Sequence, residues 1–277
     1  MTSDGRGTHL RSPVTFAGLM IRFPIAKINL GLYITEKRAD GYHNLETVFM
    51  PVATVQDVLE AVPAQGETVR MHLGGLPVAG DSKDNLVWKA YELLRDRFPD
   101  VIPALDWHLH KAIPMGAGLG GGSSDGAETL LLLNEAYQLH LPEATLLELA
   151  LQLGSDCPFF IYGKPCFASG RGERLEPMNL NLDAYRIEIV PSDIHVSTGK
   201  AFGMLHPRPA PFDLRQLSQV PVEDWRFTIG NDFEAPVCTM HPELARTKQQ
   251  LYDRGAVYAQ MSGSGSALFA LFRKDIS

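Results

Sequence analysis

The strongest candidate for chemistry in this sequence is a glycine-rich segment that spans residues 114–124. Glycine has no Cβ, so its backbone turns freely and can approach a ligand closely enough for several N–H groups to face one anion. A helix that starts at the end of the segment would add free N–H groups and the positive end of its dipole. The segment therefore predicts a polyphosphate-binding loop made of these residues: Pro114, Met115, Gly116, Ala117, Gly118, Leu119, Gly120, Gly121, Gly122, Ser123 and Ser124.

Other interpretations of this glycine loop are weaker. Gly116, Gly118 and Gly121 have the GxGxxG spacing of a dinucleotide-binding Rossmann unit, but that unit needs a second parallel strand, and the pattern here predicts a second helix at residues 142–153. The Gly-Lys-Ser/Thr ending of a Walker P-loop is missing. A merely flexible loop would not explain the many glycines between a strand and a helix whose start offers two serine caps.

The elements that must position the loop are a strand before it and a helix after it. Residues 105–112 alternate between apolar and polar side chains, and a leucine-rich helix is expected to begin near Ser124. The mixture of predicted strands and helices along the chain favours an α+β fold. Further strands are predicted at residues 21–34, 45–52, 57–62, 68–73, 164–175, 184–191, 257–261 and 268–272, and further helices at 85–97, 198–205, 231–239 and 243–254.

Composition limits the class of protein. With 277 residues, of which 45% are hydrophobic, the chain can bury a sizeable core. A net charge of -7 argues against a nucleic-acid partner. The three cysteines lack the spacing of a disulfide framework or a zinc site. No apolar run approaches the roughly 20 residues that span a bilayer, so no membrane partner and a cytoplasmic location are expected.

Three segments, in the right order, resemble the motifs of the GHMP kinase superfamily. Residues 25–30 look like its first motif, the glycine loop its second, and residues 261–266 its third. The resemblance implies two lobes with ATP between them: an N-terminal lobe similar to the second domain of ribosomal protein S5 and a ferredoxin-like C-terminal lobe. We expect a disordered leader at 1–20, an ATP-binding lobe at 21–175 and a C-terminal lobe at 176–277. The implied activity is ATP-dependent phosphorylation of an alcohol, with Mg²⁺ accompanying ATP.

The turn at residues 38–45 resembles those GHMP kinases that act on a cytidine-diphosphate-linked polyol in the non-mevalonate route to isoprenoid precursors. An aromatic ring beside an imidazole, Tyr42 with His43, suits stacking and hydrogen bonding to cytosine. Phe202 falls where these kinases place a second aromatic, although a single Phe on a helix also fits a core position. The alternatives are a homoserine or mevalonate kinase and a non-catalytic nucleotide- or RNA-binding module.

By the same resemblance, Lys27 and Asp156 match the catalytic pair. Asp156 would accept the proton of the attacking hydroxyl, and Lys27 would pair with it. Asn29 would orient the substrate or Asp156, while Ser123 or Ser124 would hold the phosphates with Mg²⁺. Without the resemblance, Asp156 would be interpreted as a helix cap and Lys27 as a solvated strand lysine. No further metal ligand can be identified from the sequence.

The remaining expected contacts come from the resemblance alone. Asn85 and Lys111 would contact the adenosine, and their alternatives are a helix N-cap and a solvated lysine. Gly263 and Gly265 of the third motif would approach the substrate or the phosphates with their backbone. Residues 231–234 are either an N-capped helix start or a structural signature of the family.

Overall fold

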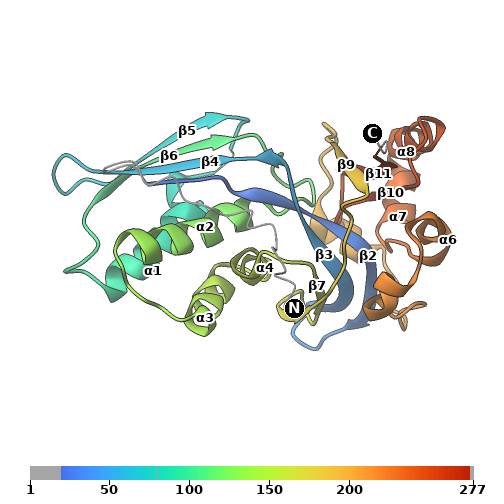
Figure 1. Ribbon diagram of the computed structural model, residues 1–277, viewed down its shortest axis with the longest axis horizontal. Coiled ribbons are helices and arrows are strands. Elements are labelled where there is room, and N and C mark those ends of the chain that lie inside the picture. The colour runs from blue at the N-terminus through green and yellow to red at the C-terminus, as the bar shows by residue number, and fades with distance from the viewer. Residues whose placement is uncertain (1–19, 79, 275–277) are drawn as a thin grey trace, which may run out of the picture.

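The computed structural model describes residues 20–78 and 80–274 (Figure 1). The leader expected at residues 1–20 lies outside the described residues except for Met20, which begins strand β1 (Met20–Arg22). Three sheets and the helices packed on them form the described chain. The long strands β2 (Ile25–Lys37) and β3 (His43–Gln56) run through the middle of the molecule and connect its two ends.

The first sheet, in the order β1-β4-β6-β5, carries the strand that precedes the glycine loop. Its strands pair antiparallel except for β5 with β6, which are parallel. Trp107 and Leu109 of β6 are buried in the same core as the helices on that face, while His108 between them is exposed, as the alternation predicts. The bounds are β4 (Val58–Pro63), β5 (Arg70–Gly75), β6 (Leu105–Lys111), α1 (Leu86–Arg97), α2 (Gly121–Ala136) and α3 (Glu143–Leu153).

The second sheet, in the order β2-β3-β7-β8, carries the first motif and the Tyr-His turn. Its strands are antiparallel, with Lys27 opposite Pro51 and Lys37 opposite His43. The turn between β2 and β3 is closed by a hydrogen bond from the Arg38 N–H to the Tyr42 carbonyl, 2.8 Å long. Strand β7 covers Cys166–Ser169 and β8 covers Arg174–Pro177, so β8 spans the predicted lobe boundary at residue 175.

The third sheet, in the order β10-β11-β9, forms the C-terminal end together with short helices (Figure 1). All its strand pairs are antiparallel. Its apolar side chains share a core with the helices, in which Phe233, Leu244 and Leu268 are buried. The bounds are β9 (Tyr185–Val190), β10 (Tyr258–Met261), β11 (Leu268–Arg273), α5 (Thr198–Gly203), α6 (Trp225–Thr228), α7 (Glu234–Met240) and α8 (Pro242–Asp253), with 3-10 helices at Ser82–Asp84, Leu214–Gln219 and Val222–Asp224.

Two helix predictions near the site need correction. The sequence after Pro158 was expected to return to strands, but helix α4 (Cys157–Tyr162) comes first. Its side chains are almost all buried, so it has no polar face from which a helical period could be recognised. Helix α2 begins at Gly121 rather than near Ser124, and its N-cap is Gly120 at φ +71°, with no side-chain cap. The expected serine caps are therefore wrong.

Within the described ranges, no helix combines the length and the apolar character needed to cross a membrane.

Candidate active site

The glycine loop connects β6 to α2, and two of its glycines are required by close packing. Gly118 and Gly120 both have φ near +70 to +80°, a region that side chains disfavour. A Cβ on Gly118 would lie 2.0 Å from the Ser262 carbonyl oxygen. One on Gly120 would lie 2.8 Å from the Phe160 ring and 3.0 Å from Cγ of Lys27. The loop is therefore pressed against the other two motifs.

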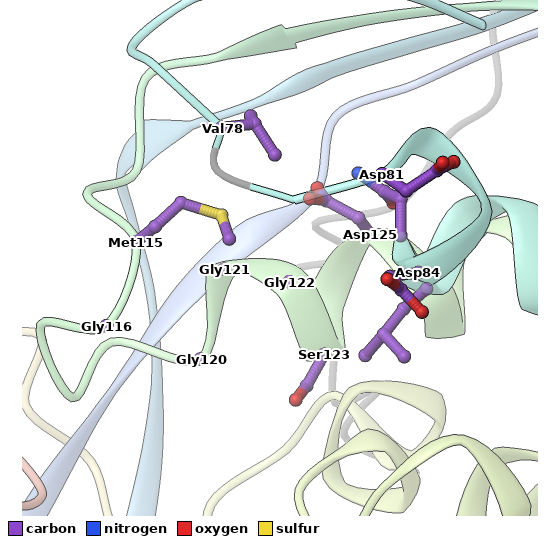
Figure 2. Close-up of a pocket in the computed structure, with 12 residues that line it drawn as sticks. Val78, Asp81, Asp84, Met115, Gly116, Gly120, Gly121, Gly122, Ser123 and Asp125 are labelled. Atoms are coloured by element: carbon purple, nitrogen blue, oxygen red, sulfur yellow. The ribbon is translucent and has the colours of Figure 1, made fainter. Parts of the chain in front are cut away.

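A cavity of about 330 Å³ lies beside the start of α2 (Figure 2). Figure 2 shows Met115 and Val78 on one side, Asp81 and Asp84 on the other, and the first turn of α2 below. The free N–H groups of that turn and the helix dipole favour an anion there. The cavity is lined by Val78, Asp81, Asp84, Asn85, Leu86, Met115, Gly116, Gly120, Gly121, Gly122, Ser123 and Asp125.

Only part of the predicted loop lines this cavity. The side chains of Ala117, Leu119 and Ser124 are buried in the protein, Gly118 packs on Ser262, and Pro114 lines a different cavity beside β9. These residues determine the conformation of the loop and do not line this cavity. The lining also comes entirely from residues 78–125, so the cavity lies within the predicted N-terminal lobe, not between the lobes.

A buried cluster of charges lies under the loop. The Lys111 ammonium is fully enclosed and is hydrogen-bonded to the Asp57 carboxylate and, at 2.5 Å, to Oδ2 of Asp125. Oδ1 of Asp57 also accepts the N–H groups of Ala112 and Ile113, at 2.6 and 2.9 Å. Lys111 therefore anchors the loop, which excludes a solvated lysine, and the enclosed side chain gives no support to the expected adenosine contact. Burial raises the pKa of Asp125 to about 8, although the Lys111 charge opposes the shift.

Asn85 is a helix N-cap that also lines the cavity. Its Oδ1 accepts the Val87 N–H at 2.9 Å, so it caps α1. It also lines the cavity. The cap therefore fixes the position of this amide at the cavity, and its contact with adenosine stays a prediction.

The structure brings Lys27 and Asp156 together. The Lys27 ammonium lies 3.7 Å from Oδ2 of Asp156 and donates to Oδ1 of Asn29 at 2.7 Å. It is buried above the Phe49 ring, with 5.0 Å between the nitrogen and the ring centroid. Burial lowers the pKa of Lys27, and the Asp156 charge opposes the shift. A solvated lysine is therefore excluded.

Asp156 occupies the N-cap position of α4, but its side chain makes no capping hydrogen bond. The side chain is 35% exposed, which leaves the carboxylate accessible to a substrate. A residue kept only as a cap would use its carboxylate on the backbone N–H groups of the helix. Both interpretations of Asp156, as a helix cap and as a catalytic residue, fit its position at the start of α4. The orientation of its side chain favours the catalytic interpretation.

Asn29 positions Lys27 rather than Asp156. Besides accepting from Lys27, it donates from Nδ2 to Oγ1 of Thr47 at 3.0 Å, and Thr47 donates in turn to the Gly31 carbonyl at 2.5 Å. Asn29 is almost completely buried, and its amide is occupied by these partners. Its expected direct contact with the substrate is not supported by this arrangement.

Hydrogen bonds join the three motifs into one unit. The Lys27 N–H donates to the Leu119 carbonyl at 2.9 Å, and the Ser262 hydroxyl donates to the Gly118 carbonyl at 2.9 Å. Gly263 packs on Gly118, and Gly265 packs on Met261. Neither glycine lines this cavity, and the third motif packs against the loop, so the expected approach of Gly263 and Gly265 to the substrate or the phosphates stays a prediction.

The aromatic residues predicted for a base pocket come from distant segments. The His43 ring, at the start of β3, stacks on the Phe202 ring of α5, with centroids 4.9 Å apart and planes at 18°. Phe202 also meets Phe233 edge-on at 4.9 Å. Tyr42 is 58% exposed, and the guanidinium carbon of Arg171 lies 4.9 Å from its ring centroid. Phe202 is thus a core residue on one side and the partner of His43 on the other.

Several residues of the site were missed. Asp125 follows Ser124 directly, so an acidic residue inside a phosphate-binding motif was a usable signal. Asp57 and Thr47 gave no signal in the sequence. Their partners, Lys111 and Asn29, lie on other strands, and only the pairing of the strands brings them into contact. Arg171 also gave none, since it lies in the turn between β7 and β8.

The thiols at and near the site are buried. Burial raises the pKa of Cys157, next to Asp156, to about 12, and that of Cys166 also to about 12. A hydrogen bond with Ser123 opposes the shift at Cys157. Burial also raises the pKa of Cys238.

Comparisons with known proteins agree with this geometry. Residues 85–164 match the GHMP kinases N terminal domain and residues 222–276 match the GHMP kinases C terminal domain. The chain is 48% identical over 258 residues to the 4-diphosphocytidyl-2-C-methyl-D-erythritol kinase of Bacteroides thetaiotaomicron, covering 92% of this chain and 93% of that protein. It is 46% identical over 255 residues to the kinase of that name from Parabacteroides distasonis, with 92% of each covered.

Solved structures show the same relationship. A crystal structure of 4-(cytidine 5'-diphospho)-2C-methyl-D-erythritol kinase matches with a TM-score of 0.77 and 32% identity over 91% of this chain and 90% of that one. A homoserine kinase from Cytophaga hutchinsonii matches with a TM-score of 0.71 and 17% identity, over 94% of this chain and 87% of its own, which supports the fold alone. The two-lobed α+β fold expected from the motifs is confirmed, and the chain belongs to the GHMP kinase superfamily and, within it, to the 4-diphosphocytidyl-2-C-methyl-D-erythritol kinase family.

Proposed function

We propose that this protein transfers the γ-phosphate of ATP to the 2-hydroxyl of 4-diphosphocytidyl-2-C-methyl-D-erythritol, giving the 2-phosphate and ADP in the non-mevalonate isoprenoid pathway. The observation that carries the proposal is the Lys27 ammonium 3.7 Å from the accessible Asp156 carboxylate, on a strand that is hydrogen-bonded to the glycine loop. The identity of relatives that carry this name supports the choice of acceptor. The expected cytoplasmic location stays a prediction.

In the mechanism, the acceptor hydroxyl attacks the γ-phosphorus while the bond to the ADP oxygen breaks. Asp156 accepts the hydroxyl proton, and the N–H groups at the start of α2 hold the phosphates. The charge on Lys27 lies near the transferring group, where negative charge must be stabilised. The hydrogen bond from Lys27 to Asn29 fixes the direction of the ammonium, so this charge is in place before the substrates bind.

The cavity also fits the Mg²⁺ that accompanies ATP. Ser123 and Asp125 are both among its lining residues, and Oδ1 of Asp125 is buried without a hydrogen-bond partner among the described residues. Mg²⁺ prefers such oxygen ligands and keeps several waters, so one or two protein oxygens with the phosphates suffice. When bound, it would neutralise part of the phosphate charge. The described residues hold no larger cluster of metal-ligating side chains.

Recognition of the cytidyl group is assigned to Tyr42, His43 and Phe202. Phe202 stacks on the His43 ring and would hold it in place for the base, and Tyr42 is exposed next to His43 along the chain. Stacking on such rings is worth roughly 1–3 kcal/mol per base. An acceptor without a base would lose this contribution.

ADP release, measured with each acceptor at equal concentration, tests the proposal. The diphosphocytidyl acceptor should support turnover, whereas homoserine, mevalonate and a blank without acceptor should give only background hydrolysis. Turnover with homoserine or mevalonate that equals turnover with the cytidyl acceptor would contradict the assignment. Product analysis by ³¹P NMR should show one new monophosphate ester.

A further inference from the structure

The short loop at residues 170–173, between β7 and β8, touches both ends of the proposed acceptor site. At one end, the Gly170 carbonyl accepts the Leu45 N–H at 2.7 Å, just beyond the Tyr-His turn. At the other end, a Cβ on Gly172 would lie 3.4 Å from Oδ1 of Asp156. Arg171 lies between these contacts, with its guanidinium over the Tyr42 ring. The loop therefore connects the base-binding residues to the catalytic carboxylate.

The guanidinium of Arg171 is available to an anion because the neighbouring carboxylates are occupied. Asp40 accepts from Arg38 at 2.9 to 3.2 Å and from the Tyr42 N–H at 3.1 Å. Glu173 accepts the backbone N–H of Arg171 at 2.5 Å and so folds back on the turn. Among the residues that the structure describes, none forms an ion pair with Arg171. Its contact is the face of Tyr42, which leaves the N–H groups at the edge of the guanidinium free for another partner.

The acceptor of the proposed reaction has a cytosine at one end, the reacting hydroxyl at the other and a diphosphate between them. With the base at Tyr42 and the hydroxyl at Asp156, the diphosphate must pass the loop that carries Arg171. A planar guanidinium binds phosphate oxygens through two parallel hydrogen bonds. We infer that Arg171 binds the diphosphate of the acceptor; this inference rests on the proposed function and adds a substrate-binding residue to it.

Binding of cytidine and of CDP to the purified full-length protein separates the diphosphate from the base. The variants are Arg171→Gln, which keeps a planar polar end group on a shorter side chain but removes the charge, Arg171→Lys, and Arg174→Gln as a control at an exposed arginine of the same hairpin. Isothermal titration should show CDP affinity falling about ten-fold or more in Arg171→Gln, because hydrogen bonds to charged groups are the stronger ones. Cytidine affinity should change less than about two-fold, since Tyr42 remains.

The lysine variant and the control variant test whether the charge and the geometry of Arg171 are both needed. Arg171→Lys should recover part of the CDP affinity, because the charge returns without the two parallel hydrogen bonds. Arg174→Gln should bind both probes like the unaltered protein. In steady-state assays, Arg171→Gln should raise the acceptor KM and leave the ATP KM unchanged.

Three outcomes would overturn the inference. Equal losses for cytidine and CDP would mean that Arg171 only supports the Tyr42 ring. Unchanged CDP affinity in Arg171→Gln, while the unaltered protein binds both probes, would remove Arg171 from the acceptor site and leave the proposed function intact. If the unaltered protein binds neither probe, the proposed function itself fails, and this inference fails with it.

Discussion

Asp156 illustrates how a single side chain decides between a structural and a catalytic role. It stands where a helix cap is expected, but its carboxylate is turned toward the Lys27 ammonium instead of the helix backbone. The sequence located both residues through their motifs. It did not reveal that Asn29 holds Lys27, because alternation places both side chains on one face of β2 but does not say which polar atoms meet.

Replacing Asp156 by Asn should leave folding and ATP affinity unchanged and reduce kcat by about 10²- to 10⁴-fold, the usual contribution of a general base. Lys27→Met should also reduce kcat. The double variant should lose far less than the product of the two single losses, because the pair acts as one unit. The exposed Asp183, changed to Asn, is the matched control. Near-normal kcat in Asp156→Asn at saturating substrates would return this residue to the role of a cap.

The lowered pKa of Lys27 gives a pH dependence with a definite sign. Since burial favours the neutral amine, the positive charge should be lost below the usual lysine value of 10.5, and kcat should fall on the alkaline side as it is lost. Asp156 opposes the shift, so Asp156→Asn should move the titration of Lys27 to still lower pH. NMR of ¹³C-labelled lysine Cε in both proteins measures this. A titration that stays in place in Asp156→Asn would contradict the charge coupling.

At the scale of elements, the glycines of the loop have different tasks. Gly118 is surrounded by protein, whereas a Cβ on Gly122 would meet no protein atom within 4 Å. Gly122 is also in the first turn of α2, where it lines the cavity. Gly118 therefore serves the packing of the motifs, and Gly122 leaves open space beside the cavity.

This difference predicts opposite results for two alanine variants. Gly118→Ala should lower the free energy of unfolding by more than about 2 kcal/mol, since overpacking and a strained backbone are among the strongly destabilising changes. Gly122→Ala should fold normally, because alanine is the better helix former, yet bind a nonhydrolysable ATP analogue more weakly. Thermal denaturation and calorimetric titration measure the two effects. Unchanged nucleotide affinity in Gly122→Ala would separate this turn from the phosphates.

The sequence predicted most elements that have a clear period and missed those whose stability comes from burial. The strands β6, β10 and β11 and the helix α8 appear close to where alternation or helical spacing indicated. Helix α4 was missed because it is apolar on all sides. The motifs identify residues but not the direction that each segment faces, so the sequence did not indicate that the cavity beside α2 is lined by residues 78–125 alone. Lys111 turned inward to Asp57, a partner that no local pattern indicated.

At the scale of the whole molecule, Asn231 ties the C-terminal part to the site. Its Nδ2 donates to the carbonyls of Met261 and Gly263, both at 2.8 Å, and its Oδ1 accepts the Phe233 N–H at 2.9 Å. The neighbouring backbone is hydrogen-bonded to Leu32 of β2 on both sides. Asn231 is therefore a structural link, not only the start of a helix, and it holds the third motif against the glycine loop.

Asn231→Ala should reduce the free energy of unfolding by about 2–4 kcal/mol, because it leaves buried backbone groups without partners. Nucleotide affinity should fall as well, since the third motif supports Gly118. Asn181→Ala, at an exposed asparagine, should change the unfolding free energy by less than about 0.5 kcal/mol. Chemical denaturation of the three proteins provides the comparison. A fully stable Asn231→Ala would show that this link is dispensable.

The enclosed thiol beside Asp156 has a consequence for covalent chemistry. With a pKa of about 12, the Cys157 sulfur is present as thiolate in only about one molecule in 10⁵ at neutral pH. Alkylating agents and peroxide act on the thiolate, so the folded protein should keep its activity in buffers without reductant and after exposure to iodoacetamide. An electrophilic inhibitor directed at the Asp156 carboxylate would therefore find no reactive cysteine next to it.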